Sequence, residues 1–317
     1  MITSENTTIK NKKLPGLPNL SMSDFKNHRA CFFDKMSDNS VALFSAAHDV
    51  TRSNDTEFSF CQNKNFYYLT GFNEPDALLI LLKRDNIEQA ILFSLPKDKN
   101  QEVWHGRRVG QKKACQEYGF DQCFILDEKN ELIQQHLNGL TQVYFSFDDK
   151  PLTQFVFDLL AKVRATIRQG SKVPAQLVDA SPLINEQRLI KSANEIELMR
   201  QTNYISCLAH KRAMQKTKAG LFEYQIENEI LHEFTRHGAR YAAYATIVAG
   251  GDNANILHYT DNNEPLNDND LLLIDAGGEL SGYAADITRT FPINGKFTAP
   301  QKALYQLVLD AKTEVIA

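Results

Sequence analysis

Short apolar runs alternate with polar, helix-like stretches through the first half of the chain. Four of these runs are typical of β-strands, because β-branched, aromatic and other apolar residues dominate them: 40–47, 77–84, 89–96 and 142–147. Segments 110–119 and 151–165 have the pattern of helices. The alternation predicts an α/β domain over residues 22–168.

The second half begins with helix patterns and continues with strand patterns. Ser192 and Glu195 have capping-box spacing, which predicts a helix from there to about Lys218. Segment 222–237 carries apolar residues on one helical face, and a last helix begins near Pro300. Between these helices lie four strand-like segments: 241–251, 256–260, 271–278 and 282–293. Helices followed by antiparallel-looking strands predict an α+β domain.

A polar stretch separates the two halves. Segment 169–182 contains two prolines, which is typical of a connection between domains. We therefore expect a linker over residues 169–188 and a second domain over 189–317. Residues 1–21 are polar with two prolines and lack the apolar stretch of a secretory signal, so we expect a flexible tail there.

Composition narrows the class of protein. Of 317 residues, 43% are hydrophobic and 23% are charged, which is ordinary for a globular protein. A net charge of −4 gives no basic surplus for nucleic-acid binding, and no apolar run is long enough for a transmembrane helix. The five cysteines are odd in number and form no CxxC pair, which disfavours a disulfide framework or a structural zinc site. These features fit a cytoplasmic protein.

Two aspartates, Asp275 and Asp286, stand eleven residues apart in the β-prone segment LLLIDAGGELSGYAADITRT (271–290). If a hairpin turns at 279–282, the two residues lie directly opposite, with Cβ atoms roughly 4.5–5.5 Å apart. Two carboxylates this close repel, so either one stays protonated or a divalent cation, or a pair of cations, compensates them. The spacing alone also allows Asp286 to cap a loop or to pair with Arg289.

The segment IDAGGELSGYAADITRTFPI (274–293) resembles the two-aspartate strand pair of the pita-bread metallopeptidases, the superfamily of methionine aminopeptidase, prolidase and aminopeptidase P. Segment ILHYTDN (256–262) adds the histidine expected there, and 65–82 and 103–111 resemble the N-terminal domain of aminopeptidase P. The resemblance covers roughly residues 22–317. It implies an α/β N-terminal domain and an α+β pita-bread catalytic domain, of which only the first half is present.

The resemblance also implies roles for individual residues. Asp275 and Asp286 would be two of five protein ligands around two divalent metal ions, for which carboxylates favour Mn²⁺. His258 would act in catalysis and contact the substrate, Trp104 would line the substrate pocket from a neighbouring subunit, and Tyr244 would support the metal ligands through its hydroxyl. The residues alone leave a structural role open for His258, Trp104 and Tyr244.

The function implied is that of an aminopeptidase that removes the N-terminal residue preceding proline from peptides, as a homo-oligomer. The family's remaining ligands, one histidine and two glutamates, come later in its catalytic domain, so we expect a truncated chain that is inactive alone. Three alternatives remain: a prolidase that cuts only Xaa-Pro dipeptides, a creatinase-like amidinohydrolase without metals, and a non-catalytic binding module. The presence of both aspartates disfavours the amidinohydrolase. The presence of both aspartates together with His258 disfavours the non-catalytic binding module.

Overall fold

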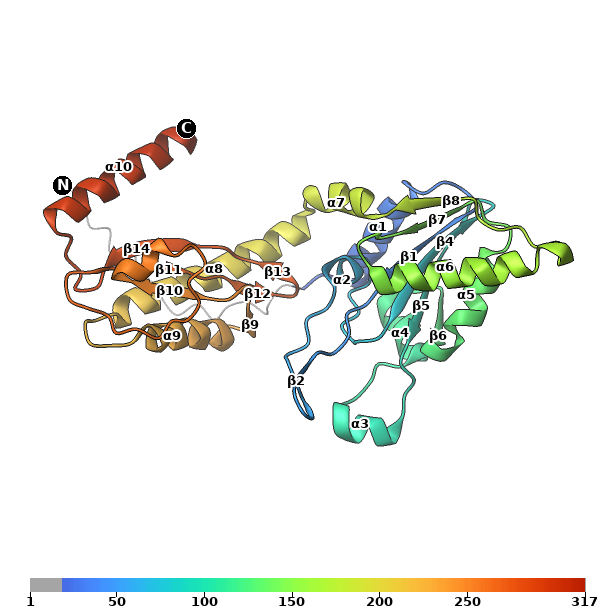
Figure 1. Ribbon diagram of the computed structural model, residues 1–317, viewed down its shortest axis with the longest axis horizontal. Helices are drawn as coiled ribbons and strands as arrows, with labels where there is room; N and C mark the ends of the chain where they lie inside the picture. Colours follow the sequence, from blue (N-terminus) through green and yellow to red (C-terminus); the bar gives the residue numbers. More distant parts are fainter. Residues whose placement is uncertain (1–18, 317) are drawn as a thin grey trace. The chain divides into compact units, whose positions relative to one another are not determined.

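The computed structural model describes residues 19–316, which divide into two compact units (Figure 1). One unit spans Leu20–Ser192, and the other runs from Ala193 to the end of the described chain. Most of the expected tail lies outside the described residues. The expected linker at 169–188 instead contributes a strand and a helix to the first unit, because Ile184 is fully buried in one hydrophobic cluster of that unit and Leu177 packs against the other.

The first unit is built on a six-stranded sheet with the order β6-β5-β4-β1-β7-β8. Its strands are β1 (Ser40–Ser45), β4 (Leu78–Arg84), β5 (Ile87–Ser94), β6 (Gln122–Ile125), β7 (Gln142–Phe145) and β8 (Gln176–Asp179). β4 is antiparallel to both neighbours, whereas the other pairs are parallel. All four strands predicted in this half are present. An exposed hairpin, β2 (Thr51–Ser53) with β3 (Thr56–Glu57), stands apart from the sheet.

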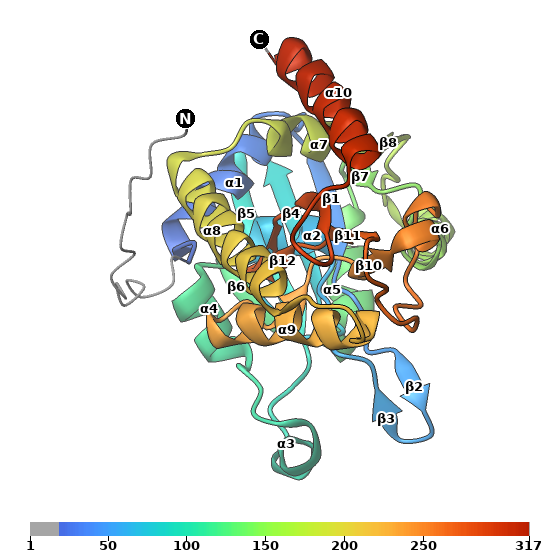
Figure 2. The ribbon, with the colours of Figure 1, turned by 90° about the vertical axis from the view of Figure 1, so that its left-hand side faces the viewer.

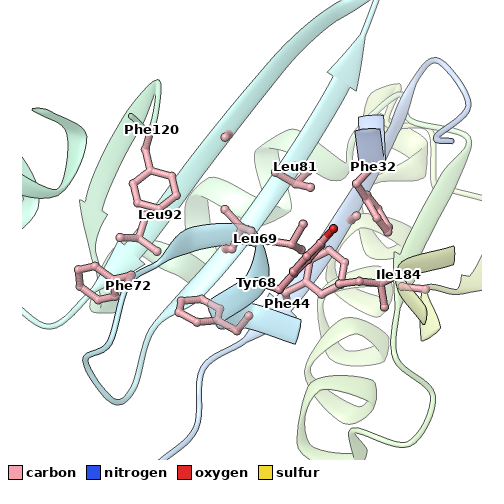
Figure 3. Packing of buried hydrophobic residues seen from close by; sticks show 14 of the residues in the cluster. Phe32, Phe44, Tyr68, Leu69, Phe72, Leu81, Leu92, Phe120 and Ile184 are labelled. Carbon is pink, nitrogen blue, oxygen red and sulfur yellow. The ribbon is translucent and has the colours of Figure 1, made fainter. Parts of the chain in front are cut away.

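Helices cover both faces of this sheet (Figure 1). Side chains alternate along β1, so Ala42 and Phe44 face one layer while Val41 and Leu43 face the other. The first layer contains α1 (Met22–Phe33), α2 (Lys64–Thr70), α4 (Gln111–Tyr118) and α7 (Ser181–Leu189), whose aromatic packing Figure 3 shows. The second contains α5 (Lys129–Leu137) and α6 (Lys150–Ala165). The remaining elements are α3 (Lys99–His105) and the 3-10 turns η1 (Leu126–Glu128) and η2 (Ile167–Gln169). The predicted α/β class is confirmed.

The second unit packs two helices against antiparallel strands (Figure 2). The helices are α8 (Ala193–Lys216) and α9 (Glu223–Arg236). One sheet has the order β10 (Ile247–Gly250), β11 (Leu271–Asp275), β14 (Thr288–Pro292), and the other β13 (Tyr283–Ala284), β12 (Gly278–Leu280), β9 (Tyr241–Ala242). The predicted α+β class is confirmed, and α10 (Ala299–Ile316) matches the expected last helix.

One predicted strand, at 256–260, is wrong. After the 3-10 turn η3 (Gly251–Asn255), this segment forms a turn without ladder hydrogen bonds. The segment is held by side chains instead: the Tyr259 hydroxyl donates a hydrogen bond to a side-chain carboxylate on α9. The segment is therefore part of a loop, residues 251–264, which we call the His258 loop.

The hairpin that carries the two aspartates turns later than expected. Ser281 and Gly282 both have positive φ, at 49° and 83°, which is the pattern of a tight two-residue turn. Asp275 consequently pairs with Thr288 and not with Asp286, a displacement of two residues. Because side chains alternate with a period of two, such a displacement leaves every residue on its original face.

Candidate functional site

Three of the residues singled out in the sequence meet at the end of β11. Asp275 is the last residue of β11, and Asp286 lies just before β14. The Tyr244 hydroxyl donates to Asp275 Oδ1 at 2.5 Å and lies 3.2 Å from Asp286 Oδ1. A single hydroxyl proton is thus shared between two carboxylates.

The two carboxylates of this site lack an ion-pair partner in the described part of the chain. Burial, followed by the hydrogen bond to Asp275, raises the pKa of Tyr244 well above its ordinary value, so the hydroxyl remains a donor at neutral pH. Among residues 19–316, no lysine, arginine or histidine forms an ion pair with Asp275 or Asp286. The pair therefore presents negative charge that a bound cation would offset.

A close backbone approach at Gly277 brings the two aspartate-bearing segments together. A Cβ atom at this position would lie 1.7 Å from the Ala285 carbonyl oxygen and 3.1 Å from the Asp286 nitrogen. Flanking backbone hydrogen bonds, from Ala276 N to the Ile287 oxygen and from Ala285 N to the Gly278 oxygen, hold the segments at this separation. Only glycine fits here without moving the backbone of Asp286.

Helix α8 supports the same segment from its buried side. The His210 Nε2 atom lies 3.0 Å from the Ala276 carbonyl oxygen, which assigns the proton to Nε2 because a carbonyl can only accept. One turn earlier, Ser206 Oγ accepts a hydrogen bond of 3.0 Å from the Gly278 N–H. Burial lowers the pKa of His210, which favours the neutral ring. The two bonds hold the backbone that follows Asp275.

His258 lies on its loop beside the same sheet face. Its own side chain is exposed, whereas the next residue, Tyr259, is only 6% exposed. Tyr259 packs with Ile247 and Ala249, and Ile247 is the direct neighbour of Asp275 across the β10–β11 pair. The loop that presents His258 therefore covers the sheet face to which Asp275 belongs.

Trp104 lies in the other unit. It belongs to α3 and its side chain is 84% exposed, so it is not a core aromatic of that unit.

The donors present fit part of a divalent metal site. Asp275 and Asp286 offer hard carboxylate oxygens, which suit Mg²⁺, Ca²⁺ and Mn²⁺. Across residues 19–316, however, no three His, Cys, Asp or Glu side chains gather closely enough to hold a metal ion. The described chain thus supplies a pair of ligands that would need others to complete the coordination sphere.

Reasoning from sequence identified the aspartates and Tyr244 but missed Ser206, His210 and Glu223. A weak signal was present for the last of these. Glu223 stands three residues before Ile226, on the apolar stripe of α9, where a carboxylate is unusual. Ser206 and His210 likewise lie on the buried stripe of α8.

Two family models match the chain, one on each side of the boundary between the two units. Residues 25–144 match the model of the aminopeptidase P N-terminal domain, and residues 197–317 match that of metallopeptidase family M24. The first match lies within the α/β unit, and the second covers α8, α9 and the aspartate hairpin.

Relatives extend the match over most of the chain. The Xaa-Pro aminopeptidase of Escherichia coli is 45% identical over 92% of this chain and 67% of its own length, and that of Haemophilus influenzae is 43% identical over 96% and 68%. The chain therefore spans about two thirds of the length of these relatives.

Solved structures agree with the sequence relatives. Zinc-substituted E. coli aminopeptidase P in complex with product has a TM-score of 0.91 at 45% identity, covering 92% of this chain and 67% of that one. Proline aminopeptidase P II from Yersinia pestis has a TM-score of 0.90 at 48% identity, covering 93% and 68%. With the aspartate hairpin, both domain matches and these relatives in agreement, the chain belongs to the Xaa-Pro aminopeptidases of metallopeptidase family M24, as the resemblance implied.

Proposed function

We propose that this chain contributes the two-aspartate part of the active site of a peptidase that removes the N-terminal residue preceding proline. The observation that carries the proposal is the convergence of Asp275 and Asp286 on one Tyr244 hydroxyl, with no ion-pair partner for either aspartate among residues 19–316. The family is one of metallopeptidases, which implies divalent metal ions. We infer that there are two ions and that Mn²⁺ is the natural one, since carboxylates are hard ligands.

Each residue of the site has a distinct task in this proposal. Asp275 and Asp286 hold the cations, and Tyr244 fixes the rotation of both carboxylates by donating between them. Bound metal ions would polarise the scissile carbonyl and make a water molecule more acidic. His258, exposed on the neighbouring loop, donates a hydrogen bond to the substrate as negative charge develops on its carbonyl oxygen.

Trp104 serves a second part of the proposal, in which the protein is a homo-oligomer. A tryptophan that is 84% exposed is unusual on an isolated surface, and large aromatic side chains are enriched at interfaces. We infer that α3 presents Trp104 to the substrate pocket of a neighbouring subunit. Size-exclusion chromatography with light scattering tests the assembly, and a peptide-binding titration tests the pocket. A Trp104→Ala variant that assembles like the native protein and also binds peptide equally well would contradict the inference.

Two further observations concern the cellular setting. None of the helices in the described part of the chain is long and apolar enough to cross a membrane. All five cysteines are free thiols, and three of them are exposed: Cys31, Cys61 and Cys207. Exposed free thiols persist in reducing compartments, which supports a cytoplasmic location.

Peptide hydrolysis tests the proposed function. The native protein, purified from its source and supplied with Mn²⁺, is expected to cleave an Xaa-Pro-Xaa tripeptide, and Asp286→Asn is expected to abolish the cleavage. Asp310→Asn, on the exposed helix α10, is the control because it removes the same charge away from the site. Chelation should remove activity and Mn²⁺ should restore it.

The same assay separates the alternatives. Hydrolysis of an Xaa-Pro dipeptide without hydrolysis of the tripeptide would make the protein a prolidase. If neither the dipeptide nor the tripeptide is hydrolysed at Mn²⁺ concentrations that stabilise the protein, the remaining alternative is a non-catalytic binding module.

A further inference from the structure

Glu223, in the first turn of α9, is a fully buried carboxylate without an ion-pair partner among the described residues. Its Oε1 atom accepts from the Gly250 N–H at 2.8 Å and from Asn253 Nδ2 at 3.0 Å. Its Oε2 atom accepts from the Tyr259 hydroxyl at 2.7 Å and from the Glu264 N–H at 3.0 Å. Both oxygens are therefore saturated by donors, which offsets the free energy of burying the charge.

These four bonds tie the His258 loop at both ends and in its middle. Gly250 precedes the loop and Glu264 closes it, so one side chain joins its two ends. The closing end is reinforced by backbone hydrogen bonds, since the Glu223 N–H donates to the Glu264 oxygen at 3.0 Å and Leu266 N donates to the Leu221 oxygen at 2.7 Å. The loop has a defined geometry although it contains no strand.

Tyr259 connects these hydrogen bonds to the orientation of the neighbouring residue, His258. Its hydroxyl is held by Glu223 and lies 3.1 Å from Asn253 Nδ2, while its ring packs on Ile247 and Ala249. With Tyr259 held inward, the adjoining His258 is directed to the exposed side of the loop. The carboxylate thus holds the residue that follows His258 against the sheet face to which Asp275 belongs.

A second side chain, Asn262, also holds the His258 loop, through hydrogen bonds to other residues. Its Oδ1 accepts from the Val248 N–H at 2.9 Å, and its Nδ2 donates to the Thr246 oxygen at 2.9 Å and to Glu227 at 3.0 Å. Asn262 fastens the end of the loop to β10, whereas Glu223, unlike Asn262, bonds to the Tyr259 hydroxyl. The two contributions can therefore be separated by mutation.

We propose that Glu223 is a positioning residue for His258: it holds Tyr259 and both ends of the loop, and so fixes the site from which His258 meets the substrate. The proposal rests on the proposed function, in which His258 contacts the peptide. A side chain that merely filled space would need no carboxylate, because four directed donors specify the loop geometry and an apolar group cannot.

The first test needs neither metal nor activity. Glu223→Gln replaces one acceptor oxygen by a donor, and Tyr259→Phe removes a single hydroxyl and so serves if the first variant folds poorly. Hydrogen exchange of loop amides 251–264 is expected to speed up by about tenfold or more in either variant, while β11 amides stay within about twofold. The His258 ring signals, assigned with a His258→Gln variant, should shift or broaden in NMR spectra. Unchanged His258 signals in both variants would overturn the proposal.

The second test separates positioning from general stability. In the native protein with an Xaa-Pro-Xaa peptide, Glu223→Gln and His258→Gln should each lower kcat/KM, and the double variant should be no worse than His258→Gln alone. Additive losses would mean that Glu223 acts independently of His258 and would overturn the proposal. Glu197→Gln, an exposed change on α8, is the matched control and should leave kcat/KM unchanged. If the native protein hydrolyses nothing, the proposed function fails while the NMR result still decides whether Glu223 orients His258.

Discussion

Gly277 has no side chain, and this allows the two aspartate-bearing segments to approach each other closely. Sequence inspection draws attention to the carboxylates, yet their separation depends on a glycine between them that carries no chemistry. Because the obstacle to a Cβ atom is the Ala285 carbonyl, which is backbone, the neighbouring chain cannot simply rotate away. The glycine is therefore a structural requirement of the site.

We expect Gly277→Ala to destabilise the second unit by about 1–3 kcal/mol, in the range seen for overpacked cores. The measurement is the urea midpoint of β11 amide signals in NMR spectra, which reports this unit alone. Gly278→Ala is the matched control, since the three atoms nearest to its Cβ would all belong to side chains, the nearest at 3.3 Å. Equal midpoints for Gly277→Ala and the native protein would show that the backbone of Ala285 moves freely.

His210 gives a prediction on pH. Burial lowers its pKa from 6.5, so the folded chain binds this proton less readily than the unfolded chain. Stability contributed by the neutral ring is therefore present above pH 6.5 and is lost as the pH falls toward the folded pKa. An NMR titration of the His210 ring should give a pKa below 6.5, and the urea midpoint of β11 should fall on acidification. A ring that titrates at or above that value would refute the expectation.

Some residues of the site could be predicted from the sequence and others could not, for a physical reason. Asp275 and Asp286 were found because charge in a β-prone run is conspicuous. Ser206 and His210 were not, because polar residues on a helix are ordinary at the surface, and only the packing shows which side of α8 is buried. A pattern of types cannot tell a solvated polar residue from one that holds a buried backbone.

Helices and strands lie where the sequence predicts them wherever the apolar pattern extends over many residues. The central strands β1, β4 and β5 and the helices α6, α8 and α9 all lie where the pattern predicted them. Short strands were harder: 282–293, expected as one strand, contains β13 and β14 with Asp286 between them. The predicted hairpin register is wrong by two residues. The register depends on which residues adopt positive φ at the turn, and these are Ser281 and Gly282.

The connection between the units leads to a prediction on proteolysis. Lys191 is exposed and lies between α7 and α8, outside both helices. Lys172 is also exposed, but its backbone is held by hydrogen bonds to Asn138 and Gly139. We expect trypsin to cut after Lys191 before it cuts after Lys172, because cleavage requires a backbone that can leave its contacts.

Mass spectrometry of the early fragments identifies the first of these two cuts. Lys191→Gln should delay separation of the units, whereas Lys172→Gln should not. Early cleavage at Lys172 in the native sequence would move the connection back to the polar segment that the sequence suggested.

For the molecule as a whole, the number of metal ligands governs activity. We expect the 317-residue chain, purified by itself and given excess Mn²⁺ and an Xaa-Pro-Xaa peptide, to show no appreciable hydrolysis. Asp275 and Asp286 can attract a cation, but a dinuclear site needs further ligands to fix its geometry, and no third His, Cys, Asp or Glu joins them among residues 19–316. Hydrolysis that disappears in Asp286→Asn would contradict this expectation and show that the site is completed in another way.

The exposed position of Trp104 on α3 determines what the intrinsic fluorescence of this protein reports. It is the sole tryptophan of the chain, it is 84% exposed, and it belongs to the unit without the aspartates. Intrinsic emission will therefore start near the red limit typical of water-exposed indole, change little as the aspartate unit unfolds, and move to shorter wavelength only when something covers α3. The emission would then report what covers α3, not the stability of the unit that carries the aspartates.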